Sequence, residues 1–176
     1  KYIDIPFQHV SNNILSRMHR GHNKDDIINI INTTRSKIPD ITIRTAFIIG
    51  FPGETKNDFN ELLDFLKEYK LERVGVFKYS EEEGTYASTK YKDNISEKVI
   101  LNRIDEIMKL QAKISFEKNR EKIGKTLRVI VDYFDGEFYA GRTEGDSPEI
   151  DNEVLIKINN KSNKIKIGNF YNVKIT

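Results

Sequence analysis

Residues 47–55, FIIGFPGET, carry the strongest chemical signal in the sequence. A run of apolar strand-forming residues stops at Gly50 and turns through Pro52 and Gly53, directly before a helix pattern. One interpretation is that the glycines and the proline simply shape a loop. Glycines also lack a Cβ, so they let a flat ligand approach the backbone amides. This corner is therefore a candidate ligand site, and an ordinary loop is the alternative.

Side chains close to the corner offer both charge and apolar surface. Alternation along residues 41–50 places Arg44, Ile48 and Gly50 on one face, opposite the face that packs on helices. Ligands of α/β folds bind at the carboxyl ends of the strands, where Gly50 lies. Arg44 could pair with a charged group of a ligand through its planar guanidinium, or it could form an internal ion pair with Asp4 one strand away.

Other polar residues near the corner have both a functional and a structural interpretation. Gln8 and His9 end the preceding strand, and His9 either faces a ligand or packs against a helix. Arg17 and Arg20 either meet a charged group of a ligand or are solvated at the surface. Glu54 is interpreted as structural, because an acid in the first turn of a helix complements the helix dipole.

The elements that position the corner alternate between strand and helix patterns. Strand patterns cover residues 2–8, 41–50 and 73–79, and a helix pattern follows each of them. The helix after the corner has Thr55 as its N-cap and Asp58 three residues later, a variant of the capping box. This order predicts an α/β fold with a parallel sheet and right-handed crossovers.

From residue 120 onward the sequence changes to short strands with no helix pattern between them. Five strand patterns, separated by Asp-Gly, Asn and Gly turns, occupy residues 126–134, 137–143, 153–159, 163–168 and 170–176. Five strands in so short a segment predict a small antiparallel β-barrel. We therefore expect one domain over residues 1–119 and a second over residues 120–176.

Composition limits the chemistry that this chain can perform. The absence of cysteine excludes disulfides, thiolate metal sites and cysteine nucleophiles, and the three histidines lack the spacing of a metal site. No apolar run approaches the roughly 18 residues of a membrane span, so we expect a cytoplasmic protein. Three parallel strands are few for a stable sheet, and the pattern begins in mid-strand at Lys1. We expect the later part of a larger protein.

Several motifs occur together and in order. They are DIPFQH, RMHRG, TAFIIGFPGET, VGVFKYSEEEGT and GRTEGDSPEID. Together they resemble the radical S-adenosylmethionine (SAM) methylthiotransferases over nearly the whole chain, and the last two favour the branch that modifies a ribosomal protein over the branch that modifies transfer RNA. The resemblance implies the C-terminal part of a partial (β/α) radical SAM barrel, followed by a small β-barrel called a TRAM domain.

The same resemblance implies roles for individual residues. SAM would bind across the carboxyl ends of the barrel strands, with Gly50 and Gly53 in the adenine-side turn and Ile48 beside the base. Gln8 and His9 match the polar strand end near the SAM ribose. The six candidates for SAM contact are Gln8, His9, Arg44, Ile48, Gly50 and Gly53.

The resemblance also implies a reaction. In the complete enzyme, SAM would be cleaved reductively, and a methylthio group would be added to the β-carbon of an aspartate of small-subunit ribosomal protein twelve. Two 4Fe–4S clusters would be required. Their cysteine ligands, a CxxxCxxC motif and three further cysteines, are absent from this sequence, so we expect this chain to be inactive alone.

The predicted barrel is polarised in charge. Residues 132–153 contain eight acids and one base, whereas residues 154–176 contain five lysines and no acid. An acidic edge repels phosphate and attracts basic protein, so four acids, expected to be exposed, are candidates for docking a basic ribosomal protein. They are Glu144, Asp146, Glu149 and Asp151. The alternatives are a merely solvated acidic turn, RNA contact through the lysine-rich half, a transfer-RNA enzyme, or an isolated RNA-binding module.

Overall fold

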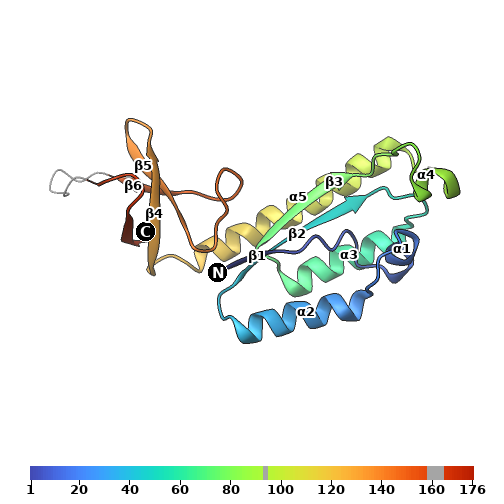
Figure 1. Cartoon of the computed structure of the whole chain (residues 1–176), viewed down its shortest axis with the longest axis horizontal. Helices are drawn as coiled ribbons and strands as arrows, with labels where there is room; N and C mark the ends of the chain where they lie inside the picture. The colour runs from blue at the N-terminus through green and yellow to red at the C-terminus, as the bar shows by residue number, and fades with distance from the viewer. Residues whose placement is uncertain (93–94, 158–164) are drawn as a thin grey trace. The chain divides into compact units, whose positions relative to one another are not determined.

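The computed structural model describes residues 1–92, 95–157 and 165–176. Their internal contacts divide them into two compact units. One unit spans Ile3–Phe116, and the other contains Lys1–Tyr2 together with Glu117–Thr176. Each unit has its own sheet (Figure 1). Each unit also has its own buried residues.

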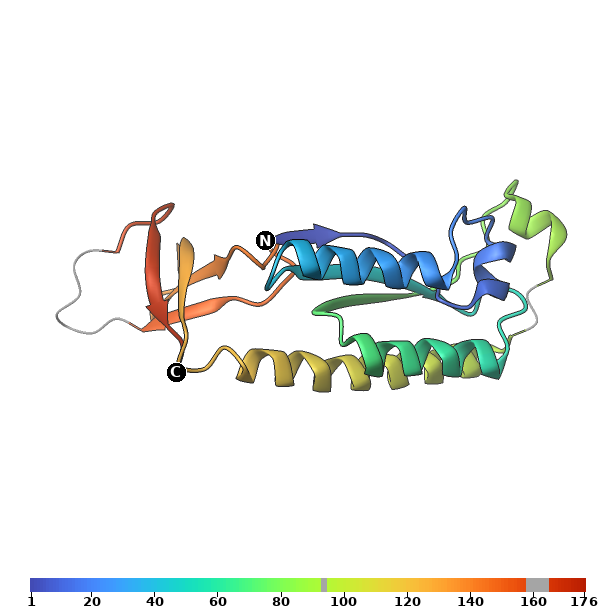
Figure 2. The ribbon, with the colours of Figure 1, turned by 90° about the horizontal axis from the view of Figure 1, so that it is seen from below.

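Strands and helices alternate through the first part of the chain, as the sequence predicts (Figures 1 and 2). The strands are β1 (Tyr2–Asp4), β2 (Thr42–Ile49) and β3 (Arg73–Lys78). The helices are α1 (Asn12–Arg17), α2 (Lys24–Lys37), α3 (Lys56–Tyr69), α4 (Tyr86–Lys90) and α5 (Glu97–Arg120). The sheet order is β1-β2-β3, and β2 and β3 run parallel, so the expectation of a parallel α/β sheet is confirmed.

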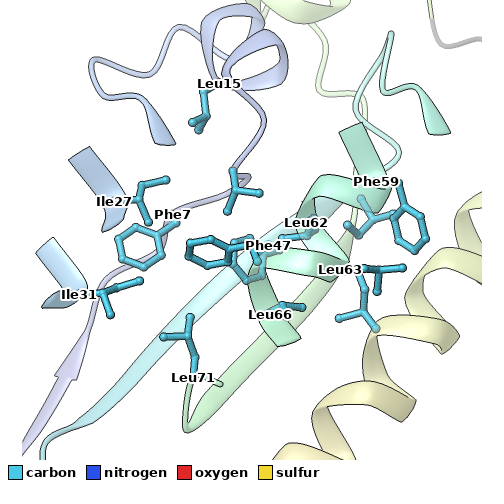
Figure 3. Packing of buried hydrophobic residues seen from close by; sticks show 14 of the residues in the cluster. Phe7, Leu15, Ile27, Ile31, Phe47, Phe59, Leu62, Leu63, Leu66 and Leu71 are labelled. Atoms are coloured by element: carbon cyan, nitrogen blue, oxygen red, sulfur yellow. The ribbon is translucent and has the colours of Figure 1, made fainter. Parts of the chain in front are cut away.

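Strict alternation along β2 separates a buried face from a partly exposed one. Ile43, Phe47 and Ile49 are at most 1% exposed, whereas Arg44 and Ile48 on the other face are only half-buried. The buried face belongs to an apolar cluster with residues of four helices, part of which is drawn in Figure 3. These partners are Leu15 of α1, Ile27 and Ile31 of α2, Phe59, Leu62, Leu63, Phe65 and Leu66 of α3, and Ile100 and Ile107 of α5.

Local capping explains where α2 and α3 begin. The predicted capping box of α3 is confirmed, because Thr55 and Asp58 each accept a hydrogen bond from the other's backbone N–H. Helix α2 has a second capping box, formed by Asn23 and Asp26. Ser11 precedes α1 in the N-cap position, but its hydroxyl donates to Asp58 and leaves the α1 backbone uncapped by this side chain.

The second unit contains an antiparallel sheet (Figure 2). Its strands are β4 (Thr126–Phe134), β5 (Phe138–Thr143), β6 (Val154–Lys157) and β7 (Phe170–Lys174), in the order β6-β5-β4-β7. Four of the five predicted strands are therefore confirmed. The remaining pattern, residues 163–168, lies partly outside the described residues, and its described part, residues 165–168, forms no strand.

Candidate functional site

The corner between β2 and α3 needs glycine at two positions. Gly50 and Gly53 have φ angles of +85° and +89°, in the left-handed region that glycine adopts without strain. A Cβ at Gly50 would lie 2.5 Å from Cδ1 of Ile100, and a Cβ at Gly53 would lie 2.8 Å from the guanidinium carbon of Arg17. Backbone conformation and packing therefore favour glycine at both positions, whether or not a ligand lies against them.

Glu54 joins the corner to α5 through a buried ion pair. One carboxylate oxygen of its fully buried side chain accepts a 2.7 Å hydrogen bond from the Gly50 N–H, and the other lies 2.6 Å from Nη1 of Arg103. Burial raises the pKa of Glu54, while the Gly50 N–H and Arg103 oppose that rise. This partner of Glu54 was not predicted from the sequence. The signal was available, because Arg103 shares the helical spacing of the buried Ile100 and Ile107.

His9, a predicted SAM contact, is completely buried. Its Nδ1 accepts a 2.9 Å hydrogen bond from the Ser11 N–H, which assigns the proton of the neutral ring to Nε2. Burial lowers the pKa of His9 to about 4, partly offset by Asp58 and reinforced by Arg103, so the ring is neutral at pH 7. His9 is therefore buried, as its interpretation as a packing residue expects, while its Nε2 has no hydrogen-bond partner among the described residues.

Asp58 connects the beginning of α3 to the beginning of α1. It accepts hydrogen bonds from the hydroxyls of Ser11 and Thr55, from the Thr55 N–H at 2.9 Å and from the Asn13 side-chain amide at 3.4 Å. Burial raises the pKa of Asp58, but the hydrogen bonds from Ser11 and Thr55 outweigh burial, and the net shift is downward. The carboxylate therefore stays ionised at neutral pH and fixes both helix starts.

Arg44 and Gln8 lie at different distances from the corner. Nε of Arg44 lies 3.5 Å from the Asp4 carboxylate, so the internal ion pair that was one interpretation of Arg44 is present. Arg44 also precedes Gly50 by six residues, roughly 20 Å along an extended strand, so the structure does not bring it to the corner. Gln8 does lie beside the end of β2, because its carbonyl oxygen accepts the Ile48 N–H at 2.8 Å.

A cavity of about 270 Å³ opens where β2 and β3 end. Among the predicted SAM contacts, only Ile48 lines it. The other lining residues are Arg17, Met18, His19, Arg20, Phe51, Tyr79, Thr85, Tyr86 and Ala87. Phe51 and Tyr79 meet edge to face, with ring centroids 5.1 Å apart. These rings were not predicted from the sequence, although aromatic residues follow both strand ends.

The four predicted docking acids are not equivalent. Glu144 and Glu149 are exposed, as expected. The expectation that Asp146 is exposed is wrong, because it is 7% exposed and accepts hydrogen bonds from the hydroxyl and the N–H of Thr143. Asp151 is half-buried and accepts the Ser147 N–H at 2.8 Å. Asp146 and Asp151 therefore shape the turn as well as carrying charge.

Neither a metal cluster nor a membrane span occurs in the part of the chain that the structure describes. Within residues 1–92, 95–157 and 165–176, no group of three or more His, Cys, Asp or Glu side chains is arranged to hold a metal ion. In the same residues, no helix is long and apolar enough to cross a membrane. The complete sequence supplies no cysteine for an iron–sulfur cluster.

Comparison with known proteins defines the class of this chain. Residues 1–66 match the radical SAM superfamily, and residues 123–176 match the TRAM domain. The fold agrees with that of Escherichia coli coproporphyrinogen III oxidase (HemN), whose structure is described as that of a radical SAM enzyme. The TM-score is 0.56 at 16% identity, over 81% of this chain and 40% of that chain.

Curated relatives identify the family within this class. The chain is 48% identical to the ribosomal protein uS12 methylthiotransferase RimO of Phocaeicola vulgatus, 45% to that of Bacteroides thetaiotaomicron and 47% to that of Clostridium botulinum. Each match covers all of this chain, which spans about two fifths of the length of these relatives (39–40%). The similarity runs along the whole chain, which confirms the resemblance to the radical SAM methylthiotransferases, and the radical SAM match implies SAM and iron–sulfur clusters.

Proposed function

We propose that this chain is the SAM-contacting and substrate-docking part of a cytoplasmic enzyme that adds a methylthio group to an aspartate of ribosomal protein uS12. The observation that carries the proposal is the 45–48% identity, along the whole chain, to enzymes named for that reaction. The domain division proposed from the sequence, at residues 119 and 120, puts SAM contact in the first part and docking in the TRAM part.

The residues at the carboxyl ends of β2 and β3 fit the adenosine part of SAM. Ile48 and the rings of Phe51 and Tyr79 offer apolar and aromatic surface to the flat base. Arg20 offers charge to the carboxylate of the methionine part of SAM, with Arg17 as the alternative partner. The cavity volume is close to the lower end of the range for small-molecule sites, roughly 300–1,000 Å³. When bound, SAM supplies the methyl group and the radical chemistry of the family.

We propose two roles for the predicted SAM contacts, direct contact with SAM and support of the strand ends. Ile48 and the backbone of Gly50 and Gly53 remain candidates for direct contact, with Gln8 beside them. His9 and Arg44 have internal partners, so we propose that they support the strand ends and do not touch SAM.

The residues of this chain do not fit an iron–sulfur cluster, because the sequence contains no thiolate ligand. The two 4Fe–4S clusters expected for the family would have to be held by other residues of a complete enzyme. This chain alone is therefore expected to have no methylthiotransferase activity.

We assign protein docking to the exposed acids Glu144 and Glu149, with Asp151 beside them. Exposed carboxylates steer a basic partner mainly by raising the association rate. Their charge favours a basic ribosomal protein over RNA, whose phosphates they would repel.

The test is a substrate comparison with the full-length enzyme, reconstituted anaerobically and supplied with SAM and a reductant. Mass spectrometry of uS12 is expected to show one methylthio group on an aspartate, while transfer RNA stays unmodified. Modification of transfer RNA without modification of uS12 would overturn the proposal in favour of the transfer-RNA branch of the family.

A further inference from the structure

Arg17 is the last residue of α1 and contacts two segments that are distant in sequence. Its Nε donates a 3.1 Å hydrogen bond to the carbonyl oxygen of Pro52. Its guanidinium carbon lies 4.0 Å from the centroid of the Tyr91 ring. The same group fills the space that a Cβ of Gly53 would need. The guanidinium thus lies against both the corner and the Tyr91 ring.

Tyr91 in turn contacts two aromatic residues that line the cavity. Its ring centroid lies 6.0 Å from that of Phe51 and 6.1 Å from that of Tyr86, with both pairs edge to face. Phe51 and Tyr86 line the cavity, whereas Tyr91 does not appear among its lining residues. Fixing the Tyr91 ring therefore restricts where two walls of the cavity can lie.

We infer that Arg17 is a positioning residue, which fixes the corner and the segment of residues 80–92 against each other and so sets the affinity of the cavity for its ligand. The inference rests on the proposed function, since it takes SAM as the ligand. It differs from the interpretation of Arg17 as a partner of the SAM carboxylate, because here Arg17 acts through Pro52, Gly53 and Tyr91.

Arginine is the side chain that this position requires. A planar guanidinium can stack on an aromatic ring and donate an in-plane hydrogen bond to a carbonyl oxygen at the same time. A lysine ammonium keeps the charge but has no planar surface to stack. Arg17→Lys therefore separates the two interpretations, because it preserves an ion pair with SAM but loses the stacked arrangement.

The first experiment measures KM for SAM and kcat of the full-length enzyme for Arg17→Lys, Tyr91→Leu and the double variant. Each single variant is expected to raise KM for SAM about tenfold, the effect of losing one partly buried cation–π contact, while kcat changes less than about twofold. The double variant should be little worse than either single one, because both remove the same contact. A general structural defect would instead lower kcat through a smaller active fraction and leave KM unchanged.

A matched control comes from a second contact of the same kind. The guanidinium carbon of Arg128 lies 4.3 Å from the centroid of the Phe170 ring, and both residues belong to the second unit. Arg128→Lys is expected to leave KM for SAM unchanged. If Arg17→Lys also leaves KM unchanged, or Tyr91→Leu has no effect, the inference is overturned. An absence of SAM turnover by the parent enzyme would instead overturn the proposed function.

The second experiment tests the geometry without SAM, in this chain. Gly53→Ala is expected to lower the midpoint of thermal unfolding, because the new Cβ meets the Arg17 guanidinium and the backbone is left-handed. In an Arg17→Ala background the same change should lower the midpoint by less, since only the backbone strain remains. Equal losses in both backgrounds would show that Arg17 does not occupy this space, and would contradict the inference.

Discussion

Acidic side chains are held in different ways in the corner (residues 50–58) and in the acidic turn of the TRAM unit (residues 144–151). In the corner, Glu54 is paired with Arg103, which lies 49 residues away, and Asp58 accepts from Ser11, 47 residues away. In the turn, Asp146 and Asp151 accept from backbone N–H groups three and four residues away. Changes in the corner should therefore disturb a whole unit, and changes in the turn should act locally.

The largest effect is expected from breaking the buried ion pair of the corner. Arg103→Met should lower the free energy of unfolding of this chain by about 4 kcal/mol at pH 7, because it leaves the Glu54 carboxylate buried without its cation. Burial already raises the pKa of Glu54, and loss of Arg103 removes a group that opposes that rise. The loss of stability should therefore become smaller as the pH falls and the buried carboxyl takes up a proton. Denaturant unfolding at several pH values measures both effects.

The control for Arg103 lies on the same helix. Lys109 pairs with Asp105 at 2.6 Å, but both side chains are exposed. Lys109→Met should leave the unfolding free energy within the error of the measurement, since exposed ion pairs contribute little. Equal losses for the two variants would show that burial does not distinguish the corner from the surface.

A pH titration should show the effect of the buried His9. Its folded-state pKa of about 4 lies below the ordinary value of 6.5, so the unfolded chain binds the proton more tightly. The contribution of neutral His9 to the free energy of unfolding is complete above pH 6.5. It is lost as the pH falls toward 4, a change of roughly 3 kcal/mol. His9→Asn keeps an acceptor for the Ser11 N–H but does not titrate, so its stability should fall less over the same range. Parallel curves for the two proteins would contradict the assignment.

Two glycines with nearly the same positive φ angle should differ in their tolerance of alanine. Gly50 has a φ of +85° and Ile100 beside it. Gly168 has a φ of +82°, and no atom of the described residues lies within 4 Å of the position that its Cβ would take. Gly168→Ala should cost only the backbone strain, about 1 kcal/mol. Gly50→Ala should cost about 2 kcal/mol more, because the methyl group overpacks a buried site. Equal thermal shifts would mean that Ile100 moves aside freely.

The smallest effect is expected from the exposed acids of the turn. Changing Glu144 and Glu149 together to Gln should slow association with uS12 by roughly threefold at low salt and reduce the salt dependence of the rate. The thermal midpoint should not change. Stopped-flow association over a range of salt concentrations measures the effect. If the double variant associates at the parent rate at every salt concentration, the two acids have no docking role.

The parts of this structure that could be predicted from sequence are those set by neighbouring residues. The Thr55 and Asp58 capping box and the buried face of β2 follow from spacings of two or three residues. The pairs of Glu54 with Arg103 and of Arg17 with Pro52 join residues 49 and 35 positions apart, so no local pattern identifies the partner. The prediction for Asp146 was wrong because its own turn, formed with Thr143, buries it.

We propose that SAM binds where β2 and β3 end, and a nuclear magnetic resonance titration of this chain with SAM tests this most directly. If SAM binds there, the largest chemical-shift changes should occur at the backbone amides of Ile48, Phe51 and Tyr79, while the amides of Val129 and Val131 in the second unit do not move. Shifts confined to the second unit, or none at the ends of β2 and β3 at saturating SAM, would contradict the claim.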